Sequence, residues 1–162
     1  MTLRNERLTA LYDKPFVVFL IGMRINRWWR IDLWLPVAFA MVRMLKELEA
    51  NKEAGLLGWE GGGLGNPNLM VQYWESSEKL MEYARSKESA HFPAWSAFNK
   101  KVAETDAVGI WHETYEVAPL AFESVYNRMP PFGMGKVGQL VSATGELATA
   151  QRRLRRAAAK AA

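Results

Sequence analysis

Hydrophobic and polar positions in the first half of the chain alternate between strand and helix patterns. After Pro15, residues 16–24 are mostly apolar on both faces of an extended backbone, which is typical of a strand covered on both sides. Leu35 to about Asn51 repeats apolar residues at helical spacing and predicts a helix. A short strand is expected at Leu56–Glu60. This half therefore has the order strand, helix, strand.

The second half repeats this order with one strand added. A glycine-rich turn at residues 61–67 precedes it, and Ser76 or Ser77 is the expected N-cap of its first helix. A second helical segment is expected from about Ala90 to Glu104, with Pro93 in its first turn. The predicted strands are Asn68–Trp74, Val108–Val117 and Phe122–Asn127.

Two strand–helix–strand units with right-handed crossovers predict a ferredoxin-like α+β sandwich, βαββαβ with an extra strand. Helices would cover one face of a four-stranded antiparallel sheet. The other face also carries Val, Phe and Ile, and its simplest cover is a second copy of the sheet, with Phe122–Asn127 reaching across to it. We therefore expect a homodimer. The domain would span 15–140, between a polar lead-in (1–14) and a basic Ala/Arg-rich tail (141–162).

Composition is compatible with one well-packed domain. The chain has 162 residues, of which 49% are hydrophobic, and its seven Trp indicate either an aromatic-lined cavity or a dense core. The absence of Cys excludes disulfides, thiolate ligands and a Cys nucleophile. A cytoplasmic location is the expectation that agrees with this cysteine usage.

The net charge of +4 comes from the tail. Residues 151–162 hold five basic and no acidic residues, which leaves 16 basic against 17 acidic residues elsewhere. The domain is therefore not expected to bind nucleic acid. We expect the tail to be solvated or loosely docked, with an anionic partner as the alternative.

Two apolar stretches, 16–23 and 33–45, are too short to span a bilayer, so no stable membrane insertion is expected. Tryptophans and arginines also lie next to one another just before and at the start of the second stretch, which suits a membrane interface. These residues are Arg27, Trp28, Trp29, Arg30 and Trp34.

The only two histidines, His91 and His112, are the main candidates for chemistry. His91 opens the second helical segment of the second half, where the helix dipole disfavours a charged imidazole, and a metal requires the neutral ring. His112 shares one face of its predicted strand with Ile110. If that face lies under the helices, the two rings can bracket a planar cofactor; otherwise they are ordinary polar residues. No Cys or acidic residue completes a zinc site at the usual spacing.

Four motifs resemble a family of small monooxygenase-like proteins related to the antibiotic-biosynthesis monooxygenases, one of whose members acts in a fungal fumagillin pathway. The motifs are Gly22–Asn26, Val71–Trp74, His91–Trp95 and Gly109–Tyr115. The resemblance covers most of residues 15–140. It implies a dimeric α/β barrel.

A more distant resemblance concerns the C-terminal half of haem-containing aldoxime dehydratases. It rests on residues 73–76, 83–86, His91, Phe98, 111–113, 122–123, Tyr126 and Gly133. The resemblance implies that His91 is the axial iron ligand and His112 the distal acid–base residue, separated by a similar 21 residues. This chain is much shorter, and the serine and arginine that hold the aldoxime oxygen in that family have no match.

The resulting hypothesis is a haem b enzyme acting on a small organic substrate, by monooxygenase-like or aldoxime-dehydratase-like chemistry. The iron would be bound by His91 and the proton handled by His112. The residues expected to orient the substrate are Arg24, Asn26 and Gln72, and those expected to wall the cofactor pocket are Trp95, Phe98 and Ile110. Two alternatives stay open: a cofactor-independent monooxygenase in which His112 is the base, and a non-catalytic carrier of haem or a small ligand.

Overall fold

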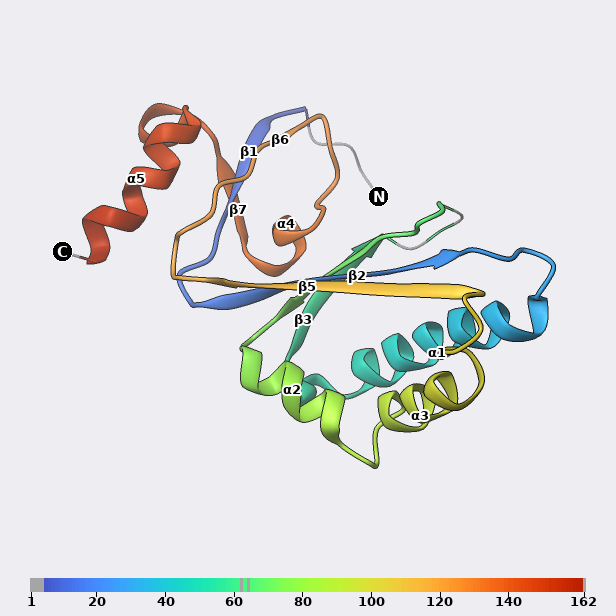
Figure 1. Cartoon of the computed structure of the whole chain (residues 1–162). Coiled ribbons are helices and arrows are strands. Elements are labelled where there is room, and N and C mark those ends of the chain that lie inside the picture. The colour runs from blue at the N-terminus through green and yellow to red at the C-terminus, as the bar shows by residue number, and fades with distance from the viewer. Residues whose placement is uncertain (1–4, 62, 64, 162) are drawn as a thin grey trace.

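The computed structural model describes residues 5–61, 63 and 65–161 (Figure 1). Its strands are β1 (Arg7–Leu11), β2 (Phe16–Ile25), β3 (Leu56–Gly61), β4 (Met70–Trp74), β5 (Val108–Val117), β6 (Tyr126–Asn127) and β7 (Gln139–Ser142). Its helices are α1 (Ile31–Ala50), α2 (Ser77–Arg85), α3 (His91–Lys101), α4 (Met134–Val137) and α5 (Ala150–Ala161), with 3₁₀ turns at η1 (Lys52–Ala54) and η2 (Gly145–Leu147).

The main sheet has the order β3-β4-β2-β5, and all of its strand pairs are antiparallel. Helices α1, α2 and α3 lie together on one of its faces (Figure 1). This arrangement confirms the predicted ferredoxin-like unit, with β5 at one edge of the sheet.

The central strand β2 is apolar on both faces, of which one is covered by helices and the other is covered in part by α4 and its neighbours. Val17 packs on the helix side, in a core cluster with Trp74 and Leu80. Phe16, one residue earlier, points to the opposite side and packs against Met134 of α4. The alternation of side chains along a strand therefore assigns odd-numbered β2 residues to the helix side and even-numbered residues to the other side.

A second sheet, of order β6-β1-β7, covers part of the helix-free face (Figure 1). Two predictions are therefore wrong in detail. The lead-in 1–14 contains β1, whose Leu8, Thr9 and Ala10 are buried; residues 1–4 lie outside the described residues. The predicted strand Phe122–Asn127 shortens to β6, which pairs with β1 of the same chain rather than with a partner.

The basic tail is docked by one buried arginine. Arg153 of α5 is 6% exposed, and its Nε and Nη2 donate to Glu123 Oε2 at 2.9 and 2.6 Å. Its Nη1 donates to the carbonyl oxygen of Leu147 at 2.8 Å. The boundary at residue 141 also falls inside β7, so the tail begins as part of the second sheet. The side chains of Arg156 and Lys160 lie outside the described part of the chain.

None of the helices within the described ranges has the length and apolar character needed to cross a bilayer.

Candidate functional site

His91 lies at the first position of α3 and is half-buried. Its Nδ1 lies 2.8 Å from the carbonyl oxygen of Ala84, near the end of α2. A carbonyl only accepts hydrogen bonds, so Nδ1 carries the proton and the lone pair of the neutral ring is on Nε2. Metal-binding histidines commonly show this arrangement, because the second hydrogen bond fixes the tautomer and the ring orientation.

Glu47 of α1 holds the segment that carries His91. Its Oε2 accepts hydrogen bonds from the backbone N–H of Ala90, at 2.8 Å, and from the hydroxyl of Tyr83, at 3.1 Å. The Tyr83 ring lies 6.3 Å from the His91 ring. Burial, together with the nearby Glu47 carboxylate, raises the pKa of Tyr83 well above its ordinary value, so Tyr83 remains a hydroxyl donor at neutral pH.

His112 lies on the exposed part of β5, on the helix side of the sheet. It pairs with Ile21 across the ladder, and odd-numbered β2 residues face the helices. Its ring is 5.5 Å from the ring of Phe19, which is also on the helix side. The face of β5 that carries Ile110 and His112 is therefore the face toward the helices, which is the arrangement that a site shared with His91 requires.

Each histidine lies beside an aromatic ring that packs on the same core cluster. Phe19, beside His112, packs against the core cluster that contains Trp74. The Trp74 ring is 5.9 Å from Tyr83, which lies beside His91. Both imidazoles therefore border the same aromatic layer between the helices and the sheet, one from α3 and one from β5.

The helix-facing side of β5 is open to solvent. Ile110 is 38% exposed, and His112, Thr114 and Glu116 on the same face are exposed as well.

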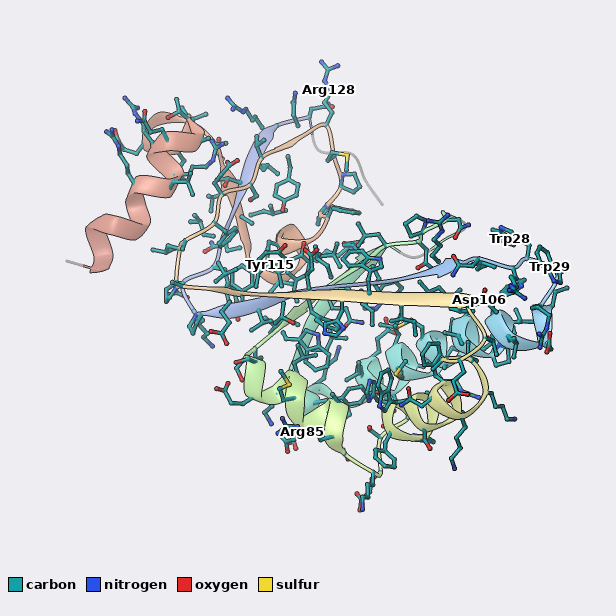
Figure 2. All side chains as sticks on the ribbon, viewed as in Figure 1. Trp28, Trp29, Arg85, Asp106, Tyr115 and Arg128 are labelled. Atoms are coloured by element: carbon teal, nitrogen blue, oxygen red, sulfur yellow. The ribbon has the colours of Figure 1, made fainter. Side chains whose placement is uncertain are left out.

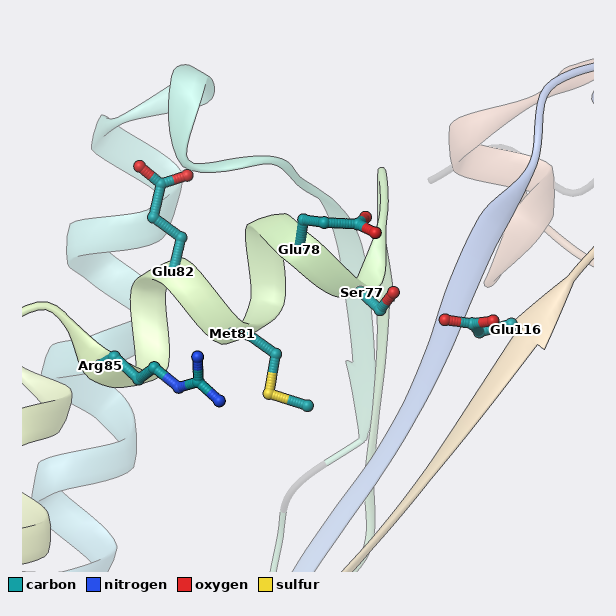
Figure 3. Close-up of a pocket in the computed structure, with 6 residues that line it drawn as sticks. All are labelled: Ser77, Glu78, Met81, Glu82, Arg85 and Glu116. Carbon is teal, nitrogen blue, oxygen red and sulfur yellow. The ribbon is translucent and has the colours of Figure 1, made fainter.

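A hollow of about 560 Å³ lies between α2 and the Glu116 end of this strand (Figure 3). Its lining residues are Ser77, Glu78, Met81, Glu82, Arg85 and Glu116. In Figure 3 the side chains of Met81 and Arg85 project from α2 into this space, and the Glu116 carboxylate faces them from β5.

The predicted wall residues lie on the same side as the histidines. Trp95 and Phe98 stack on one face of α3, with ring centroids 6.0 Å apart; Trp95 is 50% exposed and Phe98 is half-buried against Leu33 and Val102. Ile110 is two residues from His112 on β5. These three residues remain predictions as contacts of a cofactor.

Gln72 also faces the helix side, but it is buried. Its Oε1 accepts a hydrogen bond from Trp74 Nε1 at 3.0 Å, and its Nε2 lies 3.6 Å from the Met70 sulfur. Both ends of the amide are thus used inside the core, so Gln72 supports Trp74 instead of presenting a free amide to a substrate.

Arg24 and Asn26 are placed away from the two histidines. Arg24 is an even-numbered β2 residue that pairs with Gly109, so its side chain is on the helix-free face. Asn26 follows the strand, and its Nδ2 donates to the carbonyl oxygen of Asp106 at 3.0 Å, which fixes the loop before β5. The expectation that these two side chains orient the substrate required them to face the pocket. The register places Arg24 on the opposite face of the sheet, whereas Asn26 follows the strand and its role stays a prediction.

Within the described ranges no group of three or more His, Asp or Glu side chains is placed to hold a metal ion. A porphyrin iron needs only one protein ligand, because the macrocycle supplies four nitrogen atoms. His91 Nε2, which carries the lone pair of the neutral ring, would be that ligand in the predicted haem site, and haem binding stays a prediction.

The fold defines a ferredoxin-like α+β protein, with both histidines on the helix side of its main sheet. Residues 16–134 match the family model described as monooxygenase af470-like, and the chain belongs to this family. No curated protein matches the chain.

Solved structures with a similar fold include two aldoxime dehydratases. One is 17% identical, with a TM-score of 0.66 over 88% of this chain and 43% of its own. The other, solved with butyraldoxime, is also 17% identical, with a TM-score of 0.63 over 96% of this chain and 44% of its own. A dimeric ferredoxin-like protein of unknown function from Bacteroides fragilis is 14% identical, with a TM-score of 0.46 over 65% of this chain and 99% of its own. The chain spans less than half the length of the aldoxime dehydratases, and at this identity the likeness establishes the fold.

Proposed function

We propose that the protein is a haem-dependent enzyme that binds haem b through His91 Nε2 and acts on a small organic substrate at the His112 side. The observation that carries this proposal is the hydrogen bond from His91 Nδ1 to the Ala84 carbonyl oxygen, at 2.8 Å. It leaves Nε2 as the lone-pair nitrogen, which is the state required of an iron ligand. The resemblance to aldoxime dehydratases assigns His91 and His112 the same two roles.

Each residue of the site has a definite task in this proposal. Haem, when bound, supplies an iron centre capable of redox and Lewis-acid chemistry. His91 anchors the group, and Glu47 holds the start of α3 so that the ring does not shift. His112 donates a proton to the substrate atom that leaves or is activated, and takes it back from water, which its exposed side chain can reach. Thr114 and Glu116, on the same face of β5, are the polar groups available to the substrate.

Haem titration followed by absorption spectroscopy tests the proposal. Wild-type protein is expected to give a Soret band with saturable binding, and His91→Ala should remove or strongly weaken it because the residue that would hold the iron is lost. His112→Ala should retain the band and serves as the matched control. Equal haem affinity of His91→Ala and wild type would contradict the assignment. Loss of the band in His112→Ala alone would reverse the two roles.

The family description favours a second candidate, a cofactor-independent monooxygenase. In that reaction His112 would remove a proton from an electron-rich substrate, which would then react with O₂. Turnover by protein that contains no haem would support this candidate. Haem binding without any turnover would instead leave the carrier function.

The uncovered part of the helix-free face supports a homodimer. Leu20 and Val71 are neighbours on this face, and Trp111 lies beside them on β5; each is only partly buried within the chain.

Leu20→Asp should reduce the mass measured by light scattering from a dimer toward the 18.4 kDa monomer. Leu154→Asp is the control, since Leu154 is an exposed apolar residue of α5 away from this face. A wild type that is already monomeric at micromolar concentration would disprove the dimer.

A further inference from the structure

Helix α1 carries a second apolar stripe in addition to the one that packs on the sheet. Its inner stripe is buried and consists of Leu33, Ala40, Leu45 and Leu48. Its outer face presents Ile31, Phe39 and Val42, which are 53%, 57% and 47% exposed. These positions are eight and three residues apart, so they share one side of the helix. The outer face of a surface helix is normally polar, and the second stripe therefore indicates a surface that something covers.

The stripe continues into the loop before α1. Trp28 is 49% exposed and Trp29 is 72% exposed, and both lie at the end of the molecule where α1 begins (Figure 2). Trp34 Nε1 donates to the Trp28 carbonyl oxygen at 3.0 Å, and the two rings are 5.9 Å apart. The loop is thus held in a defined conformation that leaves the Trp29 ring in solvent. We call Trp28, Trp29, Ile31, Phe39 and Val42 the outer α1 patch.

The patch lies in a basic segment of the domain. Residues 27–46 contain four basic residues and one acidic residue, whereas the rest of residues 1–150 contains 12 basic and 16 acidic residues. Arg27 and Arg30 form ion pairs with Asp106 and Asp32, at 2.7 and 2.8 Å. Arg43 and Lys46, on the exposed side of α1, add positive charge beside the patch. Glu49, also exposed, lies seven residues after Val42 on the same side of α1, so the patch is apolar and has two basic side chains and one acidic side chain on its α1 border.

We propose that the outer α1 patch binds the surface of an anionic lipid bilayer, with α1 lying along the surface. Trp side chains favour the boundary between headgroups and acyl chains, and an exposed apolar stripe bordered by basic residues is typical of helices that lie in this boundary. Anionic lipids attract the basic border. A second copy of the chain is a poorer cover, because a two-fold contact through this patch would bring the two basic segments together.

Co-sedimentation with lipid vesicles tests this proposal on the full chain. The wild type should sediment with phosphatidylcholine vesicles that contain phosphatidylserine, and much less with phosphatidylcholine alone. Trp29→Ala/Phe39→Ser should lower the partition coefficient by about tenfold or more, because it removes the two most exposed rings of the patch. Arg43→Gln/Lys46→Gln should lower binding to the anionic vesicles several-fold and reduce its dependence on salt.

Val125→Ser is the matched control, since Val125 is also an exposed apolar residue (47%) but lies outside the patch and outside α1. Its partitioning should equal that of the wild type, and all variants should keep the wild-type circular dichroism and Tm. Unchanged binding of Trp29→Ala/Phe39→Ser would overturn the proposal and assign the binding to the basic tail. Failure of the wild type to sediment would overturn it as well. If the mass of Trp29→Ala/Phe39→Ser in solution without vesicles is lower than that of the wild type, the patch instead joins two copies of the chain.

Discussion

Replacing His112 with alanine is expected to lower kcat by about 10²–10⁴-fold, with little change in KM, for any substrate turned over at this site. The imidazole is on the helix side of β5 and exposed, so in the proposed function it is accessible to a substrate without being part of the core. Its removal should shift stability by less than about 0.5 kcal/mol, as for other surface side chains. Measurement of kcat, KM and Tm on the same variant checks both parts.

Two further variants sharpen this test. His112→Gln retains a hydrogen-bonding amide but does not supply a proton, so it should be almost as slow as the alanine variant. Thr114→Ala removes a polar group that is available to the substrate on the same face of β5, so it should change KM more than kcat. A fully active but destabilised His112→Ala would show that the histidine serves packing rather than catalysis.

Arg153→Ala is expected to destabilise the second sheet and α5 by about 2–3 kcal/mol. The change removes three hydrogen bonds and leaves Glu123, whose side chain is 30% exposed, without its cation. Breaking a buried ion pair by removing one partner costs about 3–5 kcal/mol, and the partial exposure of Glu123 reduces this cost. Urea unfolding monitored by circular dichroism would measure it.

The neighbouring arginine provides the control. Arg152 is about half exposed, and its contact with Glu146 is 3.9 Å long and open to solvent, so Arg152→Ala should change stability by less than about 0.5 kcal/mol. Equal effects of the two substitutions would show that α5 is not docked through Arg153. Deletion of residues 145–162 should reproduce the loss seen for Arg153→Ala, in contrast to the sequence-based expectation of a loosely docked tail.

The sequence predicted the main sheet well because its signals are local. The apolar residues on both faces of β2 form a pattern within a single segment, and so do the apolar residues at helical spacing in α1. The structure agrees with both patterns. The second sheet was missed because β1 has five residues and pairs with β7, about 130 residues later in the chain. A short strand whose partner is distant leaves no local pattern, and its pairing is decided by tertiary packing.

The site was predictable only in part, for the same kind of reason. The position of His91 at a helix start follows from a local pattern, and the structure has it there. The side of the sheet on which Arg24 lies depends on register, because a shift of one residue reverses every side chain of a strand. Glu47 was missed because its two partners, Tyr83 and Ala90, belong to segments 36 and 43 residues away in the chain.

The exposed helix side of β5 has a consequence for how this protein can evolve. Ile110, Thr114 and Glu116 lie on the same face as His112 and contribute little to the buried core. Substitutions at such positions usually change stability by no more than about 0.5 kcal/mol. If the substrate binds on this face as proposed, substitutions at these three positions can change substrate preference at little cost in stability, while selection for folding acts mainly on the other strands.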